Sequence, residues 1–268
     1  MNLERDIDPE FPFQVDYDVV AEPVCVSAVE HRSQDEILRA LQVTPEEAHD
    51  IALIPQGTPA WLTARKHRLT ASNFGAAAGM NKYKTPNGLL KDMLWNSFTG
   101  NAATRWGSAH EHVARAQYVD QMQREIEAGT SAYTSIRVEE SGLHVNPARP
   151  WLGSSPDGVV HVTTHDGTSH RFLLEIKCPF RKVFYEPAVP LYYLCQIQGV
   201  MANMELPYCD FVVWTPRAMQ ITRVAFDEVF WTNTLLPKLD HFYFQRYLPL
   251  VIAKHNGQLE PGSVVLAL

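Results

Sequence analysis

Two short apolar runs, at residues 159–162 and 172–176, lie on either side of a polar loop that is rich in Thr, Asp, Gly and Ser. Runs of this length around such a loop predict a β-hairpin. Side chains two residues apart share one face of a strand. Glu175 and Lys177 should therefore project together, while Ile176 faces a core.

Apolar positions spaced three and four residues apart, together with capping residues, predict helices in much of the remaining chain. Thr58 before Pro59 has the pattern of a helix start, and Asp227 should cap a long C-terminal helix that Pro237 interrupts. The expected helices lie at residues 33–41, from 45, from 59, at 74–80, 89–98, 105–123, 190–201 and 227–247, and further strands at 135–139, 141–145, 208–214 and 220–226.

The predicted hairpin carries three groups that suit a metal site. Asp157 lies in a Pro-Asp-Gly turn where one strand begins, and the partner strand would bring Glu175 near it, beside Lys177. Two carboxylates next to an amine form a hard-oxygen site for Mg2+, in which the amine can orient or activate water. The alternative is a plain ion pair between Glu175 and Lys177, which is the commoner role of an isolated Glu-x-Lys.

A cationic stretch lies just before another predicted helix. Arg65, Lys66 and Arg68 precede Thr70 and Ser72, and these hydroxyls with the free N–H groups of a helix start would suit a phosphate. A solvated basic face with ordinary helix caps explains this stretch equally well.

Other polar groups gain a role only in combination with these sites. Glu111 lies near the edge of the apolar stripe of its helix, where such a glutamate is usually solvated or paired with Arg115. Gln196 projects to one side of a later helix, and Arg181 and Lys182 add two cations shortly after the hairpin.

The composition is that of a soluble globular protein, with 268 residues, 46% of them hydrophobic and 20% charged. No apolar run approaches the roughly 20 residues that span a bilayer, and the acidic N-terminus lacks an apolar signal core. We therefore expect an intracellular protein, in a bacterial cytoplasm or in the nucleus or cytoplasm of a eukaryotic or virus-infected cell. Four widely spaced cysteines disfavour a zinc site or a disulfide framework.

The net charge of −7 is unevenly distributed. Residues 1–50 hold 13 acidic and 3 basic side chains, whereas the remainder holds 17 acidic and 20 basic ones. We interpret residues 1–50 as an acidic extension, residues 51–250 as the catalytic domain and residues 251–268 as a tail. A modestly basic body is compatible with a polyanionic substrate.

Five motifs occur in an order that resembles the lambda exonuclease family, the YqaJ-like viral recombinase branch of the restriction-endonuclease-like, or PD-(D/E)xK, nucleases. The motifs are Arg68…Thr70-Ala71-Ser72, Trp106-Gly107…Glu111, Ser155-Pro156-Asp157-Gly158, Glu175-Ile176-Lys177-Cys178-Pro179 and Gln196-Ile197-Gln198. Each is weak alone, and their order carries the resemblance, which extends from about Gln56 to about Phe244. It implies an α/β (α+β) fold whose central mixed β-sheet is flanked by helices.

The resemblance also implies roles for the hairpin residues. Asp157 and Glu175, helped by the carbonyl of Ile176, would be ligands of Mg2+, with two ions per site and Mn2+ as a substitute. Glu111 would be an additional carboxylate near the metals. Lys177 would orient and activate the attacking water.

Further residues would contact the substrate. Gln196 would lie beside the nucleophile or the scissile phosphate. A basic residue of the family has no exact counterpart, because Val183 occupies its position. The candidates for the 5′-terminal phosphate pocket and for other DNA contacts are Arg68, Ser72, Ser155, Arg65, Arg181 and Lys182.

The implied activity is Mg2+-dependent 5′→3′ hydrolysis of linear double-stranded DNA, for recombination or for viral or phage genome processing. Family members often form ring-shaped trimers that act with a single-strand annealing protein, so a homotrimer and such a partner are expected beside DNA ends. Two alternatives are an endonuclease of the repair or restriction type, including one that also cuts RNA, and a DNA-end-binding protein without catalysis. The complete set of Asp157, Glu175 and Lys177 disfavours the last alternative.

Overall fold

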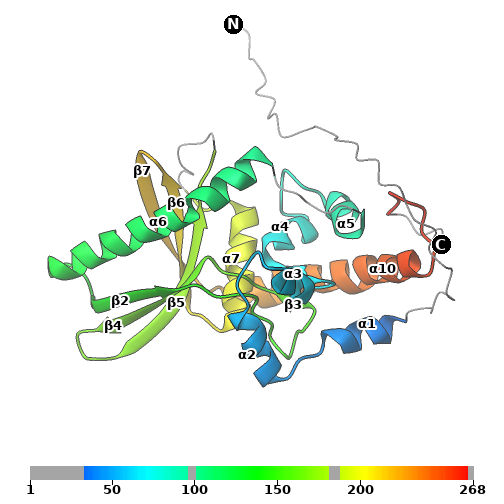
Figure 1. Cartoon of the computed structure of the whole chain (residues 1–268), viewed down its shortest axis with the longest axis horizontal. Coiled ribbons are helices and arrows are strands. Elements are labelled where there is room, and N and C mark those ends of the chain that lie inside the picture. Colours follow the sequence, from blue (N-terminus) through cyan, green and yellow to red (C-terminus); the bar gives the residue numbers. More distant parts are fainter. Residues whose placement is uncertain (1–32, 96–100, 181–187, 265–268) are drawn as a thin grey trace, which may run out of the picture. The chain divides into compact units, whose positions relative to one another are not determined.

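A five-stranded mixed β-sheet lies at the centre of the chain, for which a computed structural model describes residues 33–95, 101–180 and 188–264 (Figure 1). Within the sheet only β5 and β6 are parallel, and α7 (Leu191–Met204) connects them. The strand order is β2 (Tyr133–Glu139), β4 (Gly158–Thr164), β5 (Ser169–Lys177), β6 (Tyr208–Thr215) and β7 (Ala218–Ala225). The expected α/β fold with a central mixed sheet is therefore confirmed.

The predicted hairpin is formed by β4 and β5. Gly158 lies opposite Leu174 in the antiparallel register, so Asp157 and Glu175 come together at one end of the two strands. The expected alternation is also present, because Leu174 and Ile176 are buried in a core on the face opposite to Lys177.

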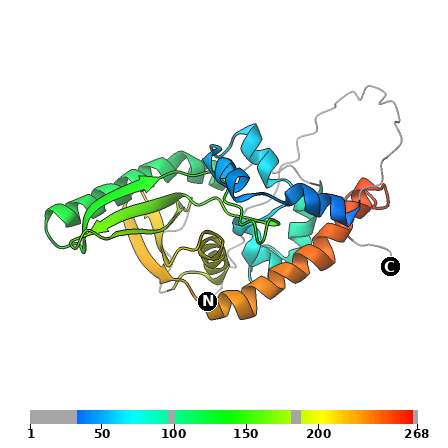
Figure 2. The ribbon, with the colours of Figure 1, turned by 90° about the horizontal axis from the view of Figure 1, so that it is seen from below.

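Helices cover both faces of the sheet, and each face has its own core. Helix α6 (Ala102–Glu127) packs Ala114 and Tyr118 against Phe172 of β5. On the other face, Leu173 of β5 belongs to the core that contains Ile197 of α7. Figure 2 shows α6 and α7 on opposite sides of the sheet.

The N-terminal helices begin at the residues that the caps predict. Ser33 and Thr44 form capping boxes, and the side chain of Thr58 accepts from the N–H of Trp61. The elements in this part are α1 (Gln34–Leu41), α2 (Pro45–Leu53), α3 (Pro59–Arg65), β1 (Leu69–Thr70), η1 (Ala71–Asn73), α4 (Phe74–Ala77) and α5 (Pro86–Trp95), and β1 pairs with β3 (Leu152–Gly153).

Helix α1 packs on the main body. Its Ile37 and Leu41 are buried in the same core as Phe74 and Leu173. The division of the chain at residue 50 stays a prediction.

The C-terminal helix continues through the expected interruption. The side chain of Asp227 accepts from the N–H of Phe230, and helical turns then run to His255, which is beyond the expected end at Tyr247. Wide π turns precede both prolines of this helix, and they accommodate a ring that lacks an N–H and crowds the preceding turn. The segments are α8 (Glu228–Phe230), η2 (Trp231–Leu235), α9 (Leu236–Asp240), η3 (His241–Tyr247) and α10 (Leu248–His255), with the prolines at 237 and 249.

The expected strand at residues 141–145 is wrong, because the structure has only an isolated bridge there, between His144 and Ser154. The N–H of Gly142 instead donates to the carbonyl of Ala52 at 2.7 Å, at the end of α2. A Cβ at Gly142 would lie 2.1 Å from the carbonyl oxygen of Ile54, so this contact requires glycine.

Other differences concern helix bounds, and the helix expected at residues 74–80 ends already at Ala77. The helix expected at residues 105–123 is longer, because Asn101 caps it at Thr104 and it extends to Glu127. The helix expected at residues 89–98 ends at Trp95, and residues 96–98 lie outside the described part. No helix of the described segments is both long enough and apolar enough to cross a membrane.

Close packing of α7 on α4 predicts a large effect of one methyl group. In Gly199→Ala the new Cβ would lie 2.3 Å from Cδ2 and Cε2 of the buried Phe74 ring. We expect a loss of about 1–3 kcal/mol in the free energy of unfolding, measured by urea denaturation. Gly107→Ala in α6 is the control, because nothing lies within 4 Å of its Cβ and helix propensity favours alanine by about 1 kcal/mol. Equal stability of both variants would contradict this packing.

Candidate active site

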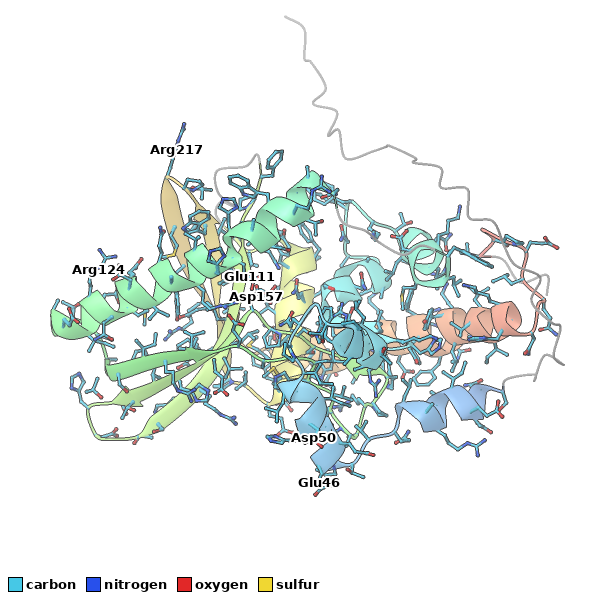
Figure 3. All side chains as sticks on the ribbon, viewed as in Figure 1. Glu46, Asp50, Glu111, Arg124, Asp157 and Arg217 are labelled. Atoms are coloured by element: carbon cyan, nitrogen blue, oxygen red, sulfur yellow. The ribbon has the colours of Figure 1, made fainter. Side chains whose placement is uncertain are left out.

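Five polar side chains meet at the end of the β4–β5 hairpin. Asp157 precedes β4, while Glu175 and Lys177 lie at the end of β5. Glu111 comes from α6 and Gln196 from α7, so the two helices that cover opposite faces of the sheet both reach this point. Figure 3 places Glu111 and Asp157 next to each other where α6 passes the sheet.

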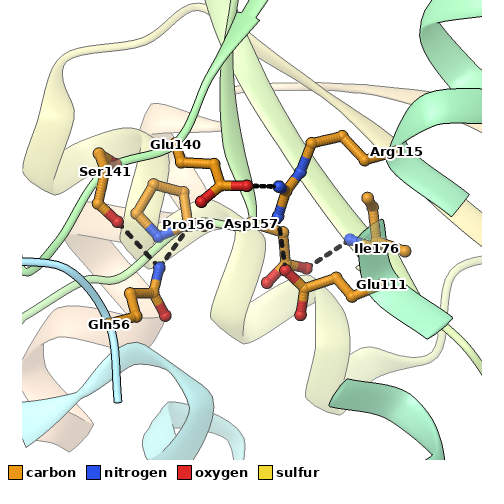
Figure 4. Close-up of polar contacts among 8 residues, drawn as sticks. All are labelled: Gln56, Glu111, Arg115, Glu140, Ser141, Pro156, Asp157 and Ile176. Atoms are coloured by element: carbon orange, nitrogen blue, oxygen red, sulfur yellow. Dashed lines mark hydrogen bonds and ion pairs between the residues drawn. The ribbon is translucent and has the colours of Figure 1, made fainter. Parts of the chain in front are cut away.

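The carboxylate of Asp157 is oriented by the main chain. Its Oδ2 accepts a hydrogen bond of 2.6 Å from the N–H of Ile176 on the neighbouring strand (Figure 4). The turn is anchored from outside by Gln56, whose Nε2 donates at 2.9 Å to the carbonyls of both Ser141 and Pro156. Sequence reasoning missed Gln56, since its partners lie 85 and 100 residues away and no local pattern indicates them.

Glu175 is almost fully buried, with 1% of its surface exposed. Its Oε1 accepts 2.5 Å hydrogen bonds from Nζ of Lys177 and from Nε2 of Gln196. Its Oε2 is buried and has no hydrogen-bond partner among the described residues. The ion pair with Lys177 is thus present, but it occupies only one carboxylate oxygen. A buried oxygen without a partner is costly, and a cation at this position would remove the cost.

Arg115 links the third carboxylate to the loop beyond β2. Its Nη2 lies 2.7 Å from Oε1 of Glu111, four residues earlier on α6, and its Nη1 contacts Oε1 of Glu140 (Figure 4). Pairing with Arg115 was expected from the helical spacing, whereas Glu140 was missed because it comes from a separate segment.

The acidic groups of the site repel one another. Burial, and then the charge of Asp157, raise the pKa of Glu175 to about 8. The same two causes raise the pKa of Glu111 to about 7, although Arg115 opposes the shift. Burial also raises the pKa of Asp157. For Lys177 burial lowers the pKa, but the charges of Glu175 and Asp157 outweigh it and the net shift is upward. The site therefore has an excess of negative charge for its degree of burial.

The donor set fits a divalent cation that also contacts the substrate. Within residues 33–95, 101–180 and 188–264, no three Asp, Glu, His or Cys side chains close into a complete metal cage. Mg2+ does not require one, because it commonly binds one or two carboxylates together with water and substrate phosphate oxygens. Asp157 and Glu175 supply such a pair, with a free oxygen on Glu175.

A second polar cluster adjoins the carboxylates. Arg65 lies over the ring of Trp61, with 4.1 Å between its guanidinium carbon and the ring centroid, and Nη1 donates to Oγ of Ser155 at 3.4 Å. Nη2 donates to Oγ1 of Thr70 at the same distance, and Trp61 also donates to Ser155, at 3.2 Å. Burial lowers the pKa of Arg65 to about 10, so the guanidinium still carries its charge at neutral pH.

The other expected phosphate ligands are placed differently. Arg68 is buried and donates to the carbonyls of Ala64 and Leu41, at 2.7 and 2.9 Å, so it ties α1 to α3. Arg65, rather than Arg68, therefore lies beside Ser155. Ser72 is exposed on η1, and the two cations expected after the hairpin, Arg181 and Lys182, lie outside the described residues.

Comparison with known proteins shows the family to which the chain belongs. The model of the YqaJ-like viral recombinase domain matches residues 60–205, more than half of the chain, and the chain belongs to this family. The crystal structure of an alkaline exonuclease (LHK-Exo) from Laribacter hongkongensis is 26% identical, with a TM-score of 0.55, over 75% of this chain and 97% of that chain. The structure of LHK-Exo in complex with dAMP is also 26% identical, with a TM-score of 0.51 and coverages of 75% and 95%. No curated protein matches the chain. The expected family and its nuclease fold are confirmed.

The unpaired oxygen of Glu175 predicts that divalent cations stabilise the protein. Mn2+ or Mg2+ at ten times its dissociation constant should stabilise the wild type by about 1.4 kcal/mol, which corresponds to a rise in melting temperature of about 2–4 °C. Asp157→Asn and Glu175→Gln should lose this rise, whereas Asp120→Asn, an exposed change elsewhere on α6, should keep it. An unchanged metal response of both site variants in a thermal melt would exclude them as ligands.

Proposed function

We propose that the chain is a Mg2+-dependent exonuclease that hydrolyses linear double-stranded DNA in the 5′→3′ direction. The observation that carries this proposal is the convergence of Asp157, Glu175 and Lys177 at one end of the hairpin. Family membership and the likeness to an alkaline exonuclease support the same reaction class. Recombination or viral genome processing would be the setting.

The residues of the site have distinct parts in this reaction. Divalent cations bound there would neutralise the phosphodiester and activate the attacking water. Asp157 and Glu175 would hold the cations, with the first fixed by the N–H of Ile176 and the second by Gln196. Lys177 has a raised pKa and is protonated, so in this state it donates hydrogen bonds, which suits orientation of the water and stabilisation of charge on the phosphate.

The cluster around Arg65 would select the end of the substrate. Ser155 lies two residues before Asp157, a separation of at most about 7 Å of extended chain. A 5′-terminal phosphate bound by Arg65 and Ser155 would therefore bring a nearby phosphodiester to the carboxylates. A site that reads a terminal phosphate in this way favours exonuclease over endonuclease action. A ring-shaped homotrimer and a single-strand annealing partner belong to the same proposal.

Linear duplex labelled at either terminus, with 5′-phosphate or 5′-hydroxyl ends, tests the activity. With Mg2+ we expect loss of the 5′ label first, faster cleavage of phosphorylated ends and no reaction with a chelator. Lys177→Ala and Asp157→Ala should reduce the rate at least about a hundredfold, because they remove groups that act on the reacting phosphate. Intact phosphorylated duplex would refute the proposal, and nicking of a covalently closed plasmid would favour an endonuclease.

End selection depends on the charge of Arg65. We expect Arg65→Gln to lower kcat/KM about 10–100-fold for 5′-phosphorylated duplex, because a hydrogen bond to a charged group contributes about 1.5–3 kcal/mol. Cleavage of 5′-hydroxyl duplex should change little. Arg124→Gln, an exposed arginine of α6, is the matched control. An equal loss on both kinds of end would show that Arg65 supports the fold rather than the terminal phosphate.

A further inference from the structure

A row of basic side chains crosses the hairpin away from the candidate active site. In the register of the sheet, Arg137 of β2 lies opposite His161 of β4, and His161 lies opposite Arg171 of β5. The next row towards the hairpin loop consists of hydroxyls, because Ser135, Thr163 and Ser169 face one another in the same way. Residues of the two rows line an open hollow of about 490 Å3.

This row lies on the sheet face that bears the catalytic candidates. Side chains on one strand share a face at every second residue, so Arg171 projects with Glu175 and His161 with Asp157. Four residues separate the members of each pair, a distance of about 13 Å along a strand. Figure 2 shows that β2, β4 and β5 extend beyond α7, and Arg137 and Arg171 are exposed in this extension.

The charges of the row are only partly compensated within the protein. Glu139 accepts from Arg137 at 3.0 Å and lies 3.1 Å from Nε2 of His161. Arg171 has no carboxylate partner in the described part of the chain. Arg137 and Arg171 lie on either side of His161 in the row, on β2 and β5.

The positive field of Arg171 also acts on two histidines. Burial, followed by Arg171, lowers the pKa of His144 to about 4. Burial and then Arg137 lower the pKa of His161, to which Arg171 contributes, even though Glu139 acts in the opposite direction. Both histidines therefore favour their neutral forms, and Arg137 and Arg171 carry the positive charge of this surface.

We propose that Arg137 and Arg171, with the adjacent hydroxyls of Ser135, Thr163 and Ser169, bind the phosphate backbone of DNA beyond the scissile bond. This inference rests on the proposed nuclease function. Guanidinium groups and hydroxyls are the usual partners of backbone phosphates, which fix the position of DNA without reading its sequence. A duplex that follows the strands would reach the row about four base pairs from the carboxylates, at 3.4 Å per pair.

Equilibrium binding without hydrolysis tests the row. A blunt duplex of about 30 base pairs would be titrated with wild type, Arg137→Gln/Arg171→Gln and Arg124→Gln/Arg217→Gln, all in EDTA. The last variant is the control, because it removes the same charge from two exposed arginines that project away from the hairpin (Figure 3). We expect about tenfold weaker binding for the hairpin variant alone. Its plot of log affinity against log salt should be shallower by about 2, one unit for each lost phosphate contact.

DNA with uncharged backbone linkages tests where along the duplex the arginines of the row make contact. Methylphosphonate linkages placed about three to five base pairs from the end should weaken wild-type binding and leave the hairpin variant unaffected. The inference is overturned if the hairpin variant binds like the control, or if the neutral linkages weaken both proteins equally. The exonuclease proposal fails separately, when wild type binds the duplex in EDTA but does not degrade it after Mg2+ is added.

Discussion

The charge of Glu175 is the constraint on which the site depends. A carboxylate with 1% exposure is far from water, and only one of its oxygens has partners. Lys177 comes from the same strand and Gln196 from α7, so the strand and the helix must keep their positions for the charge to be tolerated. Burial and repulsion by Asp157 together raise the pKa of Glu175, so a positive charge beside it would stabilise the ionised carboxylate.

The same strand joins the two cores, and this fixes the register. On β5 the even positions pack under α6 and the odd positions face α7, with Leu173 in one core and Leu174 in the other. A slip of one residue would exchange the faces and would move Glu175 out of the site. Because apolar side chains fill both cores, any slip would expose them to water, and their burial therefore maintains the register.

Local patterns predicted most of the fold and the centre of the site. The hairpin, the cap at Thr58 and the turn at Asp157 each depend on a short stretch of sequence, so local patterns could predict them. Contacts between distant segments could not be found in this way, as Gln56 shows. Arg65 and Arg68 show the same limit of local patterns, because both precede a helix start and the sequence does not distinguish their roles. Only the packing shows that one guanidinium faces Ser155 while the other is used by main-chain carbonyls.

Strand periodicity connects the catalytic candidates to the basic row. The buried even positions of β4 and β5, namely Val160, Val162, Phe172, Leu174 and Ile176, belong to the core under α6, and Arg171, Glu175 and Lys177 of β5 lie on the odd face. Near α7 that face is enclosed and holds Asp157 and Glu175, whereas beyond α7 it is open and holds His161 and Arg171. One sheet face thus carries the acidic groups that are proposed to bind cations and, nearer the hairpin loop, the two arginines that are proposed to bind phosphates. DNA matches this arrangement, because its scissile phosphodiester needs a metal ion at the carboxylates and its neighbouring phosphates need positive charges beyond them.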